Sequence, residues 1–223
     1  RSSRELYFLG QHTVASDTAC YPAKLMHGHI ESLLNKGVDF IFYPCESYNL
    51  DEHDSINHYN CPVVAYYAEL LKANNERLTD ENFVMPYLDP NNEATTVHAL
   101  HRALKKYKLP ASLIRKAYRA GLERLQAYHE DIVREGRRIL FAAEKEGKHV
   151  VVLAGRPYHA DPEINHGITK LLNSLDIAVL SEDAVFEESP LVKVNVLNQW
   201  TYHARLYRAA EFVSEREHIS LVQ

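Results

Sequence analysis

The order of apolar and polar positions along the chain predicts short strands alternating with helices. Apolar runs rich in β-branched and aromatic residues, typical of buried strands, occupy residues 6–9, 38–43, 150–154 and 177–180. Apolar residues recur every three or four positions, as on one face of a helix, in residues 22–37, 68–75, 94–107, 168–175 and 203–216. This alternation predicts an α/β protein with parallel sheets.

The longest helical pattern covers residues 110–146. Pro110 suits a first helical turn, Gly147 suits the end, and Gly136 is the expected position of any break. At about 1.5 Å per residue the helix would reach roughly 55 Å, longer than a small domain is wide. We interpret it as a connector between two α/β lobes.

Three ranges follow from this interpretation. They are a cysteine-bearing lobe at 1–108, a helical connector at 109–147 and a second lobe at 148–223 that is truncated at its C-terminal end. The chain begins with Arg1 and stops at Ser-Leu-Val-Gln without a turn or cap, so we expect an incomplete fragment of a longer protein.

Composition and charge exclude some classes of protein. The net charge of -5 and the pI near 6.2, with basic residues interleaved among acids, leave no basic stripe for nucleic acid. No apolar run approaches the roughly 18 residues that span a bilayer, and no signal peptide opens the chain. Three cysteines, an odd number, fit a reducing compartment. We expect a soluble, cytoplasmic protein that binds neither nucleic acid nor membrane.

The three cysteines are the candidate metal ligands. Cys20 precedes a predicted helix, where the helix dipole favours a thiolate; Cys45 follows the strand at 38–43; and Cys61 opens an apolar run. A polar loop, 46–60, separates the last two. Their spacings of 25 and 16 residues, without a CxxC pair, match no zinc ribbon or ferredoxin motif, so burial in the core is the alternative.

A second candidate site is the loop GRPYHADPEINHG at 155–167, between a predicted strand and a predicted helix. Arg156, with His159, could bind an anion together with the N-terminus of the following helix. The alternative is a tight turn whose Asp and His side chains cap that helix, and the spacing favours neither. Neither GxGxxG nor GxxxxGK[ST] is present, so nucleotide binding is unsupported.

Three strings in the chain resemble a known family. ASDTACYPAKLMHGHI, NHYNCPVVAYYAELL and VVVLAGRPYHADPEINHGI are similar to the 2-hydroxyacyl-CoA dehydratase-related region of large acyl-CoA dehydratase activase-type proteins. The resemblance implies two flavodoxin-like (Rossmann-like) lobes with parallel sheets joined by long helices. It also implies a [4Fe–4S] cluster on three cysteines and, as partners, an actin-like ATPase activator module and an acyl-CoA.

Among the three cysteines, Cys20 and Cys61 match cysteines of the family best, and Cys45 matches less closely. Since the family pattern continues with a further cysteine-containing segment, it implies that this chain holds only part of a ligand set. The leading hypothesis is an iron–sulfur electron-transfer or dehydratase-like module in an ATP-driven, low-potential, anaerobic system. The alternatives are a non-catalytic docking domain for the ATPase module or acceptor protein, and a pair of lobes that binds a small molecule without redox chemistry.

Overall fold

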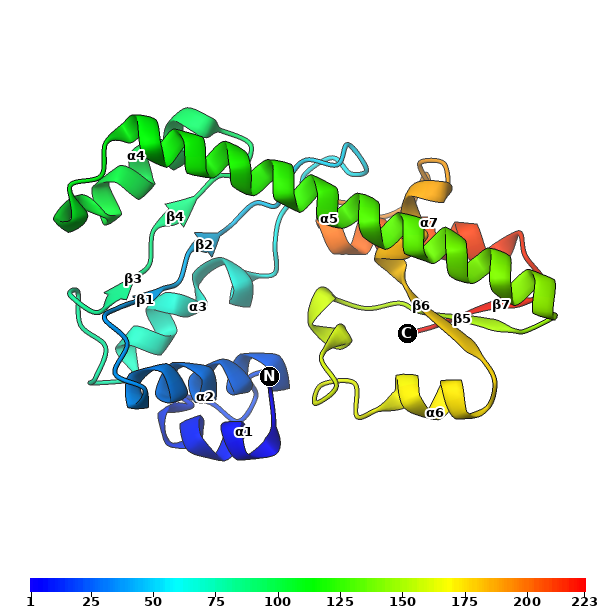
Figure 1. Ribbon diagram of the computed structural model, residues 1–223, viewed down its shortest axis with the longest axis horizontal. Helices are drawn as coiled ribbons and strands as arrows, with labels where there is room; N and C mark the ends of the chain where they lie inside the picture. The colour runs from blue at the N-terminus through cyan, green and yellow to red at the C-terminus, as the bar shows by residue number, and fades with distance from the viewer. The chain divides into compact units, whose positions relative to one another are not determined.

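The computed structural model describes residues 1–223 and confirms the α/β class. The chain forms two compact units (Figure 1). Unit 1 comprises Arg1–Leu50 and Tyr59–Tyr118, and unit 2 comprises Asp51–His58 and Arg119–Gln223. Unit 2 is therefore discontinuous in sequence, because eight residues of the predicted polar loop belong to it. The predicted ranges 1–108, 109–147 and 148–223 divide the chain differently and stay a prediction.

Unit 1 is mainly helical. Its helices are α1 (Arg4–Gly10), α2 (Tyr21–Asn35), α3 (Pro62–Ala73), α4 (Glu93–Ala103) and the first turns of α5 (Ala111–Glu146). Its strands are pairs of two residues, in which β1 (Ile41–Phe42) is parallel to β3 (Phe83–Val84) and β2 (Cys45–Glu46) is parallel to β4 (Tyr87–Leu88). With strands this short, unit 1 does not confirm a flavodoxin-like lobe.

The predicted strand at 6–9 is wrong, because these residues belong to helix α1. The Ser3 side chain accepts a hydrogen bond from the Leu6 N–H at 3.2 Å and so caps the helix. The backbones of α1 and α2 approach closely where Gly10 meets Gly28. Four apolar residues in a row do not distinguish a strand from one turn of a packed helix.

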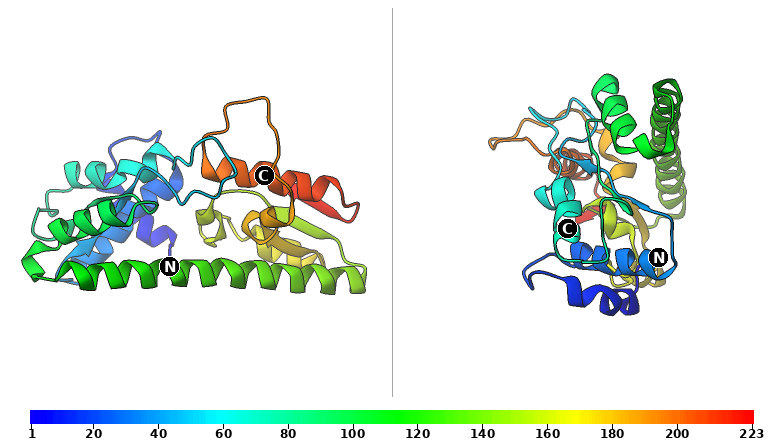
Figure 2. Two further views of the ribbon diagram at one scale, coloured as in Figure 1. Left: turned by 90° about the horizontal axis from the view of Figure 1, so that it is seen from above. Right: turned by 90° about the vertical axis from the view of Figure 1, so that its left-hand side faces the viewer.

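Helix α5 runs through Gly136 without the break that the sequence allowed (Figure 2). A Cβ atom at Gly136 would lie 2.9 Å from both the Cβ and the carbonyl oxygen of Ala184. This glycine therefore permits close packing within unit 2 rather than a bend. No helix in the chain combines the length and the apolar character needed to cross a membrane.

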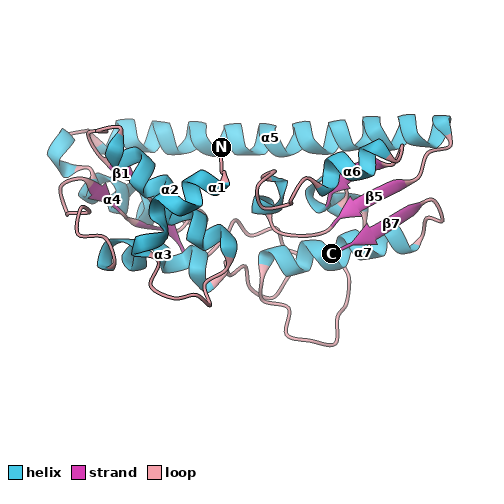
Figure 3. Cartoon of the chain, turned by 90° about the horizontal axis from the view of Figure 1, so that it is seen from below, coloured by secondary structure: helices cyan, strands magenta, loops and turns pink.

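Unit 2 contains a three-stranded parallel sheet in the order β6-β5-β7. The strands are β5 (Val150–Leu153), β6 (Ala178–Ser181) and β7 (Ile219–Val222). Helices α6 (Ile168–Ser174) and α7 (Thr201–Ser214) lie on opposite sides of the sheet (Figure 3). The sequence did not predict β7, at the C-terminal end of the chain. Because all three strands are parallel, their carboxyl ends meet at one edge, and the candidate site lies there.

Candidate functional site

A crevice of about 510 Å³ opens at the carboxyl edge of the unit 2 sheet. Its walls come from the ends of the three strands, the loop after β5 and the first turns of α6, and they include Leu153, Arg156, His159, Ile168, Glu182 and Val222. In open α/β sheets ligands bind outside the carboxyl ends of the strands, and this volume is in the range of small-molecule pockets. The crevice can therefore accept a ligand with both apolar and charged parts.

The loop after β5 holds the His159 ring in a fixed position. The Arg156 N–H donates a hydrogen bond of 2.9 Å to His159 Nδ1, so the neutral ring carries its proton on Nε2. Burial, and then the charge of Arg156, lower the pKa of His159 below its ordinary value. A Cβ atom at Gly155 would lie 2.2 Å from His159 Nδ1, so only glycine leaves room for the ring. The neutral His159 can donate from Nε2–H.

Arg156 has no carboxylate partner, although the chain has an excess of acidic residues. Its guanidinium carbon lies 5.8 Å from the centre of the Tyr202 ring, at the start of α7. From the sequence, Arg156 is expected to bind an anion together with the N-terminus of the next helix, α6. In the structure Arg156 lines the crevice together with the first turn of α6, and it also lies beside α7, which neighbouring residues in the sequence could not show. Arg156 remains a candidate to bind an anion.

Glu182 follows β6 directly and was not among the predicted site residues. Only 4% of it is exposed, and burial together with the neighbouring Asp183 raises its pKa to about 7, while Arg205 acts in the opposite direction. A carboxyl group with this pKa can accept or donate a proton at neutral pH. Its place at a strand carboxyl end was the signal in the sequence that could have indicated it.

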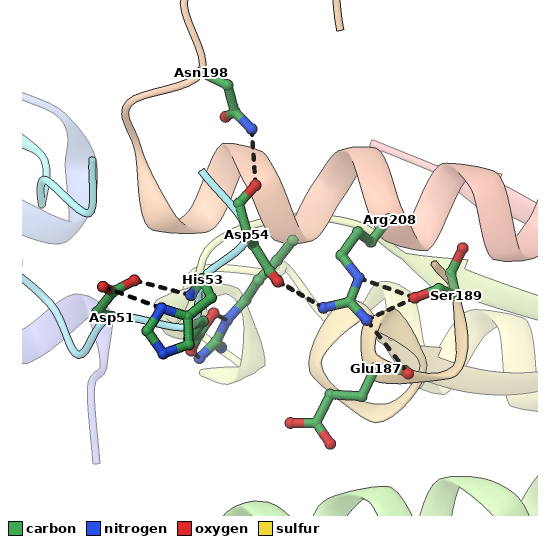
Figure 4. A network of polar contacts seen from close by, with 9 residues as sticks. Asp51, His53, Asp54, Glu187, Ser189, Asn198 and Arg208 are labelled. Carbon is green, nitrogen blue, oxygen red and sulfur yellow. Dashed lines mark hydrogen bonds and ion pairs between the residues drawn. The ribbon is translucent and has the colours of Figure 1, made fainter. Parts of the chain in front are cut away.

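Two ion pairs attach the segment Asp51–His58 to α7. Arg205 donates from Nε to Glu52 Oε2 at 2.9 Å and also pairs through Nη2, and Arg208 Nη1 lies 2.8 Å from both carboxylate oxygens of Asp54 (Figure 4). Asn198 Nδ2 donates to the Asp54 carbonyl at 3.1 Å. The arginines on α7 are therefore neutralised and held in place. The cationic group that stays unpaired beside α7 is Arg156.

The three cysteines lie in unit 1 in three different settings. Cys20 and Cys61 are the residues before the first turns of α2 and α3, exposed and half-buried respectively. Cys45 lies in β2, fully buried in the core, and burial raises the pKa of its thiol. No three His, Cys, Asp or Glu side chains gather closely enough to hold a metal ion. The structure thus does not bring the predicted ligands together, and the metal site stays a prediction.

The sequence of the chain matches the model of one protein family. The model of the CoA enzyme activase uncharacterised domain matches residues 1–185, most of the chain. The chain belongs to this family. No curated protein and no solved structure matched it. The matched residues include unit 1, Arg156, His159 and Glu182, whereas α7 and β7 follow them. The family supports the predicted relation to activases of CoA enzymes; the relation to 2-hydroxyacyl-CoA dehydratases stays a prediction.

Proposed function

We propose that this chain is a ligand-binding module of a CoA enzyme activase system, and that its crevice takes the phosphate-bearing part of a CoA-type ligand. The observation that carries the proposal is an unpaired Arg156 in a crevice at the carboxyl edge of a parallel sheet. Of the functions considered from the sequence, this one is closest to the pair of lobes that binds a small molecule without redox chemistry.

The chemistry of the crevice suits such a ligand. The phosphates of CoA are anionic, and a guanidinium binds phosphate oxygens through paired hydrogen bonds. The Nε2–H of His159 offers a further donor, because Nδ1 is engaged by the Arg156 N–H. Apolar side chains in the wall, among them Leu153 and Ile168, suit the uncharged part of the molecule.

Calorimetric titration of the chain with CoA, dephospho-CoA and pantetheine tests the proposal. We expect one site for CoA, no measurable binding of pantetheine, and binding weakened at least about tenfold by Arg156→Ala. Arg124→Ala is the matched control, since Arg124 is exposed on α5 in the same unit and has no ion pair. Absence of CoA binding, or equal affinity in the two variants, would contradict the proposal.

The second candidate function is the iron–sulfur module, in a form that this chain shares with a partner. Its support is that Cys20 and Cys61 directly precede the first turns of α2 and α3, and that neither is fully buried. A cluster bound by all three cysteines does not fit the structure, because the Cys45 side chain is fully buried in the core of unit 1. The remaining ligands would come from another protein, with the ATPase module as the expected partner.

Iron and acid-labile sulfide, measured per chain after purification without oxygen, test this candidate. If the cluster is shared, the complex with the ATPase module should contain iron. The iron should be lost in Cys61→Ala and retained in Cys45→Ala. No iron in the isolated chain or in the complex would refute it and leave a role in docking or ligand binding.

A further inference from the structure

Four buried polar atoms in the chain have no hydrogen-bond partner, and all four lie in one short stretch of unit 2. They are Ser189 Oγ, Asn198 Oδ1, Thr201 Oγ1 and His203 Nδ1. More than nine in ten buried polar groups in proteins are hydrogen-bonded, because an unpaired group loses its bonds to water without replacement. Four exceptions within residues 189–203 therefore mark a place where the chain by itself leaves hydrogen-bonding capacity unused.

Two of these atoms lie on the first turn of α7. Thr201 is the first residue of the helix and is 2% exposed, and His203 is two residues further. The first backbone hydrogen bond of the helix is from the Ala204 N–H to the Trp200 carbonyl, at 3.1 Å. The N–H groups of residues 201–203 thus have no acceptor within the helix, and the Trp200 side chain does not cap them.

The charge around this turn is positive on the side of Arg156. Its guanidinium lies over the ring of Tyr202, and its charge helps to lower the pKa of His203, after burial. The nearest carboxylates would repel an anion only weakly. Glu52 is paired with Arg205, and burial keeps Glu182 partly protonated near pH 7. A neutral His203 with its proton on Nδ1 is a further donor.

We infer that the first turn of α7 is a binding subsite for a phosphate group, formed by the backbone N–H groups of residues 201–203, the Thr201 hydroxyl, His203 Nδ1 and the Arg156 guanidinium. An oxyanion would satisfy the unpaired donors and match the partial positive charge of the helix N-terminus. The inference places one phosphate group at α7. It rests on the proposed function only for the identity of the molecule that carries this phosphate.

Inorganic phosphate is the first probe, with chloride at equal ionic strength as the control. We expect phosphate, and not chloride, to raise the melting temperature of the full chain, with a dissociation constant that is about tenfold weaker in Thr201→Val. Thr201→Ser keeps the hydroxyl and should retain binding. Thr95→Val, at an exposed position of α4 in unit 1 and outside the crevice, is the matched control and should bind phosphate as the wild type does.

The stability of Thr201→Val without phosphate separates a ligand site from a structural role. Because the hydroxyl has no partner in the chain, its removal should leave the melting temperature unchanged or raise it. A lower melting temperature together with undiminished phosphate binding would overturn the inference. Equal weakening in Thr201→Val and Thr95→Val would overturn it too, because the phosphate would then not be localised at α7.

CoA and dephospho-CoA then distinguish the source of the phosphate and separate this inference from the proposed function. CoA binding that needs Arg156 but is unchanged in Thr201→Val would overturn the α7 subsite and leave the proposed function in place. Phosphate binding that needs Thr201, in a chain that does not bind CoA, would support the subsite and overturn CoA as the ligand. Binding of CoA weakened about tenfold in both variants supports both.

Discussion

The two units treat their buried polar groups differently. In unit 1 the Thr13 hydroxyl donates to the Gly10 carbonyl at 2.9 Å and accepts from His27 Nδ1 at 2.8 Å. His27 Nε2 then accepts from the Tyr67 hydroxyl at 3.0 Å, which completes the chain of bonds. Buried Glu31 is likewise paired, with Arg77 at 2.6 Å. Every partner in these networks comes from unit 1 itself.

In unit 2, by contrast, four buried polar atoms within residues 189–203 have no partner in the chain, and two of them lie on the first turn of α7, where Arg156 contacts the Tyr202 ring. Departures from full pairing are expected where a ligand, a bound water, a reaction or local strain accounts for the unpaired group. The polar core of unit 1 is thus satisfied by its own residues, and the difference supports the proposal that a ligand binds in unit 2. Three changes in sequence test the two halves of this comparison.

The largest effect is expected for Asp54→Asn in unit 2. The Asp54 side chain is 4% exposed and pairs with Arg208, so the substitution leaves a buried guanidinium without its counter-charge. Loss of one partner of a buried pair costs about 3–5 kcal/mol in the free energy of unfolding. Urea unfolding measures the change.

Glu135→Gln is its matched control, because Glu135 pairs with Arg138 on the exposed surface of α5. We expect a change below about 0.5 kcal/mol there. Similar losses in the two variants would show that the segment Asp51–His58 is not held to α7 by a buried pair.

The next effect is expected for Gly28→Ala in unit 1. The added Cβ would lie 1.9 Å from the Leu6 carbonyl oxygen, a backbone atom, so α1 must move away from α2. We expect a loss of about 2–3 kcal/mol. Gly121→Ala on exposed α5 meets no atom within 4 Å and should instead gain roughly 0.5–1 kcal/mol. Equal effects of the two substitutions would contradict the close packing of α1 on α2.

The smallest effect concerns pH and Glu182. The folded protein holds a proton on this carboxyl up to about pH 7, whereas the unfolded chain loses it near 4.5, so its contribution to stability falls as the pH rises between these values. Glu182→Gln removes this dependence. The variant should match the wild type near pH 4.5 and be the more stable of the two above pH 8, where the buried wild-type carboxyl is charged. A wild type that is more stable than Glu182→Gln at high pH would contradict a buried Glu182 carboxyl that holds its proton.

The sequence predicted the elements whose signals are local. Pro22 and Gly37 delimit α2 nearly as expected, Pro110 and Gly147 delimit α5, and β5, α6 and β6 lie within one or two residues of their predicted positions. Cys20 does precede a helix, and Arg156 does lie in a strand-to-helix loop. These features follow from the periodicity of side chains and from the conformational preferences of proline and glycine.

The parts that were missed depend on contacts between residues far apart in the sequence. Whether Leu6–Leu9 forms a strand or a helix depends on the close approach of Gly10 to Gly28. The Glu52–Arg205 pair joins residues more than 150 positions apart, so it could not be predicted from neighbouring residues. The unpaired state of Thr201 is also a property of the folded chain, because any exposed threonine has water as its partner.

Hydrogen exchange at backbone amides, with and without CoA, tests most directly that unit 2 carries the ligand-binding chemistry. The account predicts slower exchange with CoA in residues 155–160 and in residues 201–203, and no change around Cys20 and Cys61. Protection confined to unit 1, around those two cysteines, would contradict it and return the candidate site to the cysteine-bearing region.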